Sequence, residues 1–167
     1  MINKKPSFEK ISPSFGSSIL VKQHNNEVQM TNAFWHFHPE VELVYVNKGE
    51  GKRHIGNHLS YFNNSMLILI GANLPHNGFV DRLTTTGKET IVQFKLDFLG
   101  NTFYNIPEMV NINALFARAK KVILFTPDTK QLVGPKIEEL DEIDGMARVI
   151  KLLEILNDLS QANDYSL

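Results

Sequence analysis

The chain of 167 residues contains no cysteine. This absence excludes disulfide scaffolds, thiolate zinc fingers, iron–sulfur clusters and cysteine nucleophiles, so any metal ion must bind histidine and carboxylate groups. Long apolar runs are missing as well, because the longest, residues 66–72, has the length of a strand rather than of a membrane span. The chain does contain 43% hydrophobic and 21% charged residues, a composition that predicts a folded globular protein.

Positive charge does not cluster in this sequence. The 17 basic and 18 acidic side chains leave a formal net charge of -1, and residues 127–167 hold four basic against nine acidic side chains. A surface that neutralises many phosphates needs grouped Lys and Arg, so this chain is not expected to bind nucleic acid itself. The amino terminus leads into no apolar segment of a signal peptide, so we expect a soluble, cytoplasmic protein that does not bind membranes.

The first part of the chain, up to about residue 97, is rich in short β-type segments. Runs of Val, Ile, Phe and Tyr are broken roughly every 8 to 12 residues by turn-forming groups, which predicts a sandwich or a barrel. Turns are expected at Asn47-Lys48-Gly49 and at Asn63-Asn64-Ser65, since asparagine tolerates a left-handed backbone. Residues 66–70 do not alternate in polarity, so we expect a strand that is covered on both faces.

The part after residue 97 has helical periodicity. About three α-helices are expected, with starts at Asn111 or Asn113, at Thr126-Pro127 and at Asp144-Gly145. The apolar stripe of the third helix is wider than one packing partner requires, so part of it is predicted to meet a second subunit in a homodimer. The residues expected at this contact are Met146, Val149, Ile150, Leu153 and Leu156. Residues 161–167 are polar and are expected to form a linker.

Three histidines and a glutamate form a pattern typical of metal ligands. His36 and His38 stand two apart in an extended segment and so point to one face, and Glu42 keeps that parity. His76 follows the non-alternating segment and a turn, so a neighbouring strand can bring it across the barrel. Such a donor set suits Zn, Fe, Ni or Mn. The alternative is a polar pocket in which the histidines hydrogen-bond Glu40 or Glu42.

The same residues carry a resemblance to a known family. The spacing His36-X-His38-X3-Glu42-X6-Gly49 resembles the first motif of the cupin superfamily, and Gly71-X3-Pro75-His76 resembles a shortened second motif. The wider run from Trp35 to Val46, together with Leu67 to His76, is similar to the N-terminal sensor domain of AraC-type transcription regulators. The match continues through Gln93-Phe94 and covers nearly the whole chain from about residue 18.

This resemblance implies a fold and a division of the chain. We expect a cupin-type double-stranded β-helix, a jelly-roll barrel, in residues 1–97. Residues 98–167 are expected to be a helical extension, packed on the barrel, that serves dimerisation and linkage. The family's C-terminal helix-turn-helix domain is absent from this chain, so contact with DNA is expected only through that missing domain.

The resemblance also implies a function. We expect a sensor whose small-molecule effector, a polar metabolite such as a sugar, controls DNA binding. The residues expected to contact the effector are His36, His38, Glu42, His54, His76 and Trp35. A transition-metal ion on His36, His38, Glu42 and His76 is the other expected occupant. The alternative function is a metal-dependent cupin enzyme, namely a dioxygenase, isomerase or hydrolase. The helical extension favours the sensor, so no catalytic residue is assigned.

Overall fold

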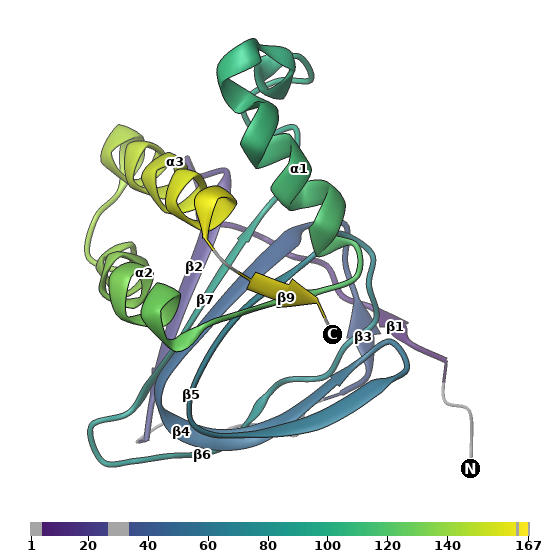
Figure 1. Ribbon diagram of the computed structural model, residues 1–167, viewed down its shortest axis with the longest axis vertical. Helices are drawn as coiled ribbons and strands as arrows, with labels where there is room; N and C mark the ends of the chain where they lie inside the picture. Colours follow the sequence, from purple (N-terminus) through teal and green to yellow (C-terminus); the bar gives the residue numbers. More distant parts are fainter. Residues whose placement is uncertain (1–4, 27–33, 163, 167) are drawn as a thin grey trace.

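The computed structural model describes residues 5–26, 34–162 and 164–166, which form a curved sheet with three α-helices on one side (Figure 1). The strands are β1 (Ser7–Phe8), β2 (Ile19–Asn25), β3 (His36–Phe37), β4 (Val41–Ile55), β5 (His58–Ile70), β6 (Val80–Leu83), β7 (Lys88–Phe94), β8 (Ile123–Phe125) and β9 (Asp164–Ser166). The helices are the short 3₁₀ turns η1 (Phe103–Asn105) and η2 (Pro107–Met109), followed by α1 (Val110–Ala119), α2 (Pro127–Glu139) and α3 (Gly145–Gln161). The expected mostly β protein with about three α-helices is confirmed.

Antiparallel pairing joins seven strands into one sheet. The hydrogen-bonded order is β2-β7-β4-β5-β8-β9, and β6 pairs with β4. The two longest strands, β4 and β5, form a hairpin around Gly56-Asn57 and curve strongly (Figure 1). Within the described strands the order does not close on itself, since β2 and β9 stand at its two ends. The closed cupin barrel therefore stays a prediction, whereas a curved antiparallel sheet is observed.

Both expected turns within this hairpin lie inside continuous strands. Asn64 has a φ of 77°, the left-handed backbone anticipated for asparagine, but β5 does not reverse there. Opposite it, the pairing of β4 with β5 shifts register between Val46 and Gly49. A β-bulge inserts extra residues into a strand and bends it without ending the ladder. The two segments predicted as turns therefore curve the sheet.

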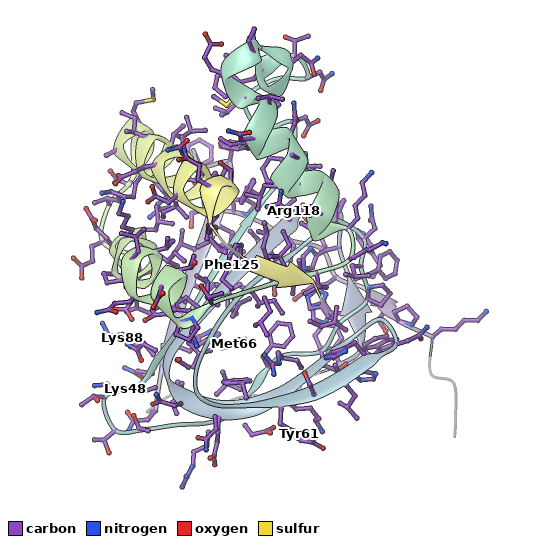
Figure 2. All side chains as sticks on the ribbon, viewed as in Figure 1. Lys48, Tyr61, Met66, Lys88, Arg118 and Phe125 are labelled. Carbon is purple, nitrogen blue, oxygen red and sulfur yellow. The ribbon has the colours of Figure 1, made fainter. Side chains whose placement is uncertain are left out.

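The sheet separates two apolar cores because alternate side chains of its strands point to opposite faces. Leu43 faces the helices and packs with residues of α1, α2 and α3, whereas Val44 faces the concave side. Met66 belongs to the concave-side core and Phe125 to the helix-side core (Figure 2). Residues 66–70 are each 1% exposed or less, which confirms a strand that is covered on both faces.

The helices begin close to the predicted starts. Helix α2 begins at Pro127 and α3 at Gly145, and α1 begins one residue before Asn111. Leu156 of α3 is fully buried in the helix-side core, so its predicted place in a dimer contact is wrong. It packs inside the chain because the inner face of α3 lies on α1 and α2. Among the described residues, no helix combines the length and the apolar character that a membrane span requires.

The chain's last described residues do not form the expected linker. Asp164–Ser166 is strand β9, which pairs antiparallel with β8. Asn163 and Leu167, which belong to the same predicted linker, lie outside the described residues. Strand β8 itself pairs with β5, so residues 98–167 supply strands to the sheet in addition to the helices.

Candidate functional site

Backbone pairing brings together histidines that are 40 positions apart. The amide of His36 donates to the carbonyl of His76 at 3.0 Å, and the amide of His76 donates back at 2.9 Å. This isolated bridge places the two rings edge to face with their centroids 4.3 Å apart. His38 follows on the same face, with its ring centroid 5.1 Å from that of His76. The structure thus unites the three histidines that the sequence pattern selected.

Glu42 completes this group from the start of β4. Its Oε2 atom lies 3.1 Å from Nε2 of His38, and its Oε1 atom lies 3.5 Å from Nε2 of His76. The three histidines and Glu42 are each 8% exposed or less. We call His36, His38, Glu42 and His76 the histidine cluster. The centroids of the three imidazole rings lie 4.3 to 5.7 Å from one another.

The backbone fixes which ring nitrogens face the centre of the histidine cluster. The Nδ1 atoms of His36 and His76 donate to the carbonyls of Phe34 and Leu74 at 2.9 and 2.8 Å. Nδ1 of His38 has a longer bond of 3.2 Å to the carbonyl of Glu40. Since a carbonyl only accepts, each Nδ1 carries a proton and Nε2 remains as the ligand atom. A second hydrogen bond of this kind orients histidines that bind metal ions.

The ring nitrogens are close enough for a metal ion. One ligand atom from each of the three histidines lies within 4.8 Å of the others. The buried Nε2 of His76 has no hydrogen-bond partner in the described part of the chain, and its 3.5 Å separation from Glu42 is long for such a bond. A cation at the centre would satisfy this atom. The donor set of imidazole and carboxylate therefore fits Zn, Fe, Ni or Mn.

Glu42 carries the negative charge of the histidine cluster. Burial alone would raise its pKa, but the His76 and His38 imidazoles outweigh burial and hold the pKa of this carboxyl well below its usual range. Burial alone would lower the pKa of His76, but the Glu42 carboxylate outweighs it and raises that pKa above 6.5. For His36 burial prevails and its pKa is lowered. Without a metal ion, Glu42 and His76 thus form a buried pair in which each group favours the charged form of the other.

Two further side chains contact the histidine cluster, and the sequence pattern selected neither of them. Gln93 of β7 lies opposite Glu42 in the sheet register, and its Nε2 donates to Oε2 of Glu42 at 2.6 Å. Glu9 approaches from the N-terminal segment and places Oε2 3.2 Å from Nε2 of His36. The available signal for Gln93 was its place beside Phe94, where the family resemblance continues. No sequence signal marks Glu9.

His54 and Trp35, both expected to contact the effector, lie outside the histidine cluster. Their rings stack on each other with centroids 4.4 Å apart and planes at 21°. The side chain of Ile55 enters the concave-side core, so the alternation of β4 directs His54 to the opposite face. The structure therefore divides the predicted effector residues into a buried cluster and a stacked pair.

Comparison with family models and with curated proteins finds no match. Among solved structures, a variant of apo ToxT from Vibrio cholerae aligns with a TM-score of 0.56 and 16% identity, covering 86% of this chain and 54% of that chain. ToxT from Vibrio cholerae with bound unsaturated fatty acid aligns with a TM-score of 0.48 and 17% identity, covering 84% and 53%. This chain thus spans about half the length of the ToxT chains. The first similarity shows a shared fold.

Proposed function

We propose that this chain is the effector-binding domain of an AraC-type transcription regulator. The observation that carries the proposal is the fold shared with ToxT, a regulator of the AraC family, across 86% of this chain. The spacing of His36, His38 and Glu42 supports it through the sequence resemblance. DNA binding belongs to a helix-turn-helix domain that follows in the full-length protein, in agreement with the acidic charge of residues 127–167.

The gene itself tests this proposal. The reading frame is expected to continue beyond the Leu167 codon and to encode two helix-turn-helix units with basic recognition helices. DNA binding by that longer protein should then change when a small-molecule effector is added, measured by fluorescence anisotropy on its own promoter DNA. A stop codon directly after Leu167 would contradict the assignment to a regulator.

In the same proposal the histidine cluster holds one transition-metal ion. His36, His38 and His76 would supply Nε2 atoms and Glu42 would supply a carboxylate oxygen, so residues of β3, β4 and the loop after β5 would hold the ion. As a Lewis acid, such an ion neutralises the buried carboxylate and can polarise a bound oxygen atom. All four side chains are buried, and four protein ligands are typical of a structural ion, whereas a catalytic ion usually has three and an open position. A sensor is thus favoured over the alternative, a metal-dependent cupin enzyme.

Metal analysis of untagged protein tests the ion. After chelator treatment and dialysis against Zn²⁺, wild type is expected to retain one equivalent by elemental analysis. His36→Ala and His76→Ala are expected to lose it, whereas His24→Ala, which removes a histidine paired with Glu89 instead, keeps it. Wild type without bound zinc, or equal retention in all variants, would overturn the metal assignment and leave the regulator assignment standing.

The proposal includes a homodimer formed through α3. Met146 and Ile150 on its outer face are 69% and 57% exposed, and Leu132 of α2 is 59% exposed. Three large apolar side chains at the surface of neighbouring helices are more than solubility requires, and a second copy of the same face would cover them. Val149 and Leu153, also expected at the contact, are partly buried.

A further inference from the structure

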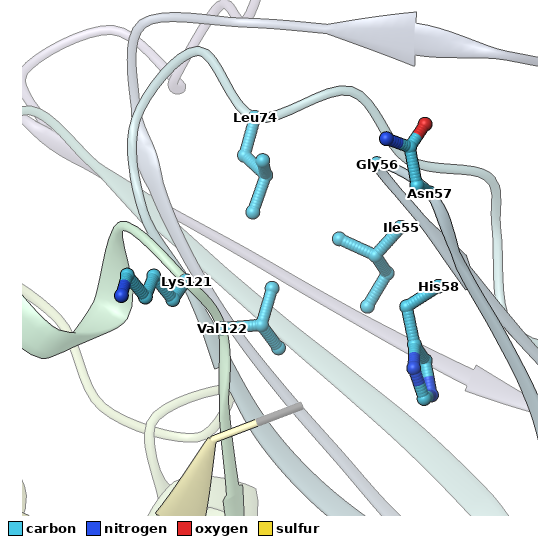
Figure 3. Close-up of a pocket in the computed structure, with 7 residues that line it drawn as sticks. All are labelled: Ile55, Gly56, Asn57, His58, Leu74, Lys121 and Val122. Atoms are coloured by element: carbon cyan, nitrogen blue, oxygen red, sulfur yellow. The ribbon is translucent and has the colours of Figure 1, made fainter.

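A cavity of about 380 Å³ opens at the rim of the concave side of the sheet (Figure 3). Its walls come from the β4–β5 turn, the loop after β5 and the turn between α1 and β8. Figure 3 shows Ile55, Leu74 and Val122 directed toward this space. None of the residues that line the cavity belongs to the histidine cluster, so the cavity does not place the cluster in contact with solvent.

Glu9 covers the histidine cluster on the side nearest to solvent. Its side chain is 28% exposed, whereas the side chains of the histidine cluster are each 10% exposed or less. Glu9 directly follows strand β1, which lies parallel to β3 (Figure 1). Its amide donates to the carbonyl of Phe37 at 2.9 Å, so its backbone is fixed beside the strand that carries His36. The N-terminal segment thus supplies the outer wall of the site.

The contact between Glu9 and His36 lacks a proton when the ring is neutral. The Nδ1 atom of His36 donates its proton to the carbonyl of Phe34, so Nε2 presents a lone pair. An ionised carboxylate also only accepts, yet Oε2 of Glu9 lies 3.2 Å from that Nε2 atom. Two acceptors at this distance repel each other unless a cation binds both. A metal ion among the Nε2 atoms would therefore stabilise the position of Glu9.

The spacing of the donor atoms fits one ion that binds both carboxylates. Two ligand atoms that are each about 2.1 Å from one ion lie about 3.0 Å apart at a right angle and about 3.4 Å apart at the tetrahedral angle. The carboxylate of Glu42 lies 3.1 and 3.5 Å from the Nε2 atoms of His38 and His76. The 3.2 Å contact of Glu9 with His36 belongs to the same range. Ions that suit imidazole and carboxylate accept more than four ligands, so a further protein donor is accommodated.

We propose that Glu9 is a further ligand of the metal ion and that the ion thereby fastens the N-terminal segment to the sheet. This inference rests on the ion that the proposed function assigns to the histidine cluster. Strand β1 consists of Ser7 and Phe8 only, and Phe8 is 62% exposed, so this pairing buries little apolar surface. A bond from Glu9 to the ion would reinforce it. Metal affinity and the order of the N-terminal segment are then coupled, each increasing the other.

The zinc affinity of the full, untagged chain tests this ligand. Competition with a chromogenic chelator should show binding that is about 10- to 100-fold weaker in Glu9→Gln than in wild type. Glu9→Asp keeps the charge but withdraws the carboxylate by one methylene group, so it should also bind zinc more weakly. The matched control is Glu89→Gln. It removes a carboxylate that lies 3.2 Å from a histidine outside the histidine cluster, His24, and should bind zinc as wild type does.

Hydrogen exchange measured by NMR tests the coupling to the N-terminal segment. The amides of Ser7 and Glu9 donate to the carbonyls of Trp35 and Phe37. Zinc should slow the exchange of both amides in wild type, because the segment then opens less often. In Glu9→Gln at saturating zinc, the exchange of the Ser7 amide should stay as it is without metal.

Three results would overturn the role of Glu9 and leave the ion on the histidine cluster. The first is equal zinc affinity of Glu9→Gln and wild type, and the second is exchange of the Ser7 amide that zinc does not change in wild type. The third is wild-type affinity in Glu9→Asp, because the charge would then act without a bond to the ion. Wild type that binds no zinc would overturn the metal assignment together with this inference, so the two failures are distinguishable.

Discussion

At the scale of single residues, Glu42 determines the protonation of its neighbour His76. Burial lowers the pKa of His76, and the Glu42 carboxylate more than reverses that effect. Replacing Glu42 with Gln removes the charge and leaves burial, so we expect the pKa of His76 to fall from above 6.5 to below it. NMR titration of the ring signals in metal-free protein measures this change. Glu89→Gln is the control, because Glu89 pairs with His24 instead.

His36 and His76 should affect the acid stability of the metal-free protein in opposite directions. The pKa of His76 is raised on folding, so its protonation stabilises the fold below pH 6.5, and this contribution is lost as pH rises through the folded pKa. The pKa of His36 is lowered, so stability is lost as pH falls below 6.5. Compared with wild type, His76→Gln should lose more stability between about pH 7.5 and 5.5, and His36→Gln less.

Urea unfolding at the two pH values, with a chelator present, gives the free energies of unfolding for these variants. His58→Gln controls for the loss of a histidine outside the cluster, and it should follow wild type. The same pH response in His36→Gln and His76→Gln would show that burial, rather than Glu42, governs both rings.

At the scale of elements, α3 has an inner and an outer apolar face with different roles. Ile150→Asp places a charge on the exposed outer face, so it should split the proposed dimer without unfolding the monomer. Leu156→Asp buries an unpaired charge in the helix-side core and should prevent folding. Sedimentation velocity gives the mass of each variant, and circular dichroism reports its fold. The control is Ser160→Asp, a partly buried position near the C-terminal end of the same helix. A wild-type monomer would contradict the dimer.

Sequence reasoning located the elements whose signals are local. Pro127 and Gly145 mark helix starts by their own backbone preferences, and the uninterrupted apolar run of residues 66–70 marks a strand buried on both faces. It missed the continuity of β4 and β5, because asparagine and glycine serve a bulge as well as a turn. Whether such a segment bends or reverses depends on the partner strand, which the local sequence does not specify.

The same limit applies to the candidate site. Parity along one extended segment is sufficient to group His36, His38 and Glu42. The position of His76, after residues 66–70 and a turn, was sufficient to predict that a neighbouring strand brings it to them. The contact between Gln93 and Glu42 joins residues 51 positions apart through the register of β4 with β7, which no local pattern encodes. The cavity at Val122 was missed for a similar reason, since its three walls come from segments that meet only in the folded chain.

At the scale of the whole molecule, the two cores share one sheet. The helix-side core takes Leu43, Leu67 and Phe94 from the sheet, and its remaining large side chains come mostly from α1, β8, α2 and α3. Strand β8 is also hydrogen-bonded to β5. Residues 1–97 therefore contain neither core in full. Even the concave-side core takes Val122 and Leu124 from the second half of the chain.

The boundary predicted at residue 97 divides the sequence into two regions. We expect these two regions to fold together as one unit. A fragment of residues 1–97 lacks the helix residues that pack on Leu43, Leu67 and Phe94. Its sheet would expose an apolar face, and the remaining buried area would be too small to offset the conformational entropy that the chain loses on folding. We expect this fragment to bind a hydrophobic dye and to melt without a cooperative transition, whereas the full chain melts in one transition detected equally by far-UV and near-UV circular dichroism. The matched control is a chain of 1–162, which removes β9 but keeps every α-helix and should still melt cooperatively. A fragment of 1–97 with its own sharp transition would instead establish the sheet as an autonomous domain and the helices as an appendage to it.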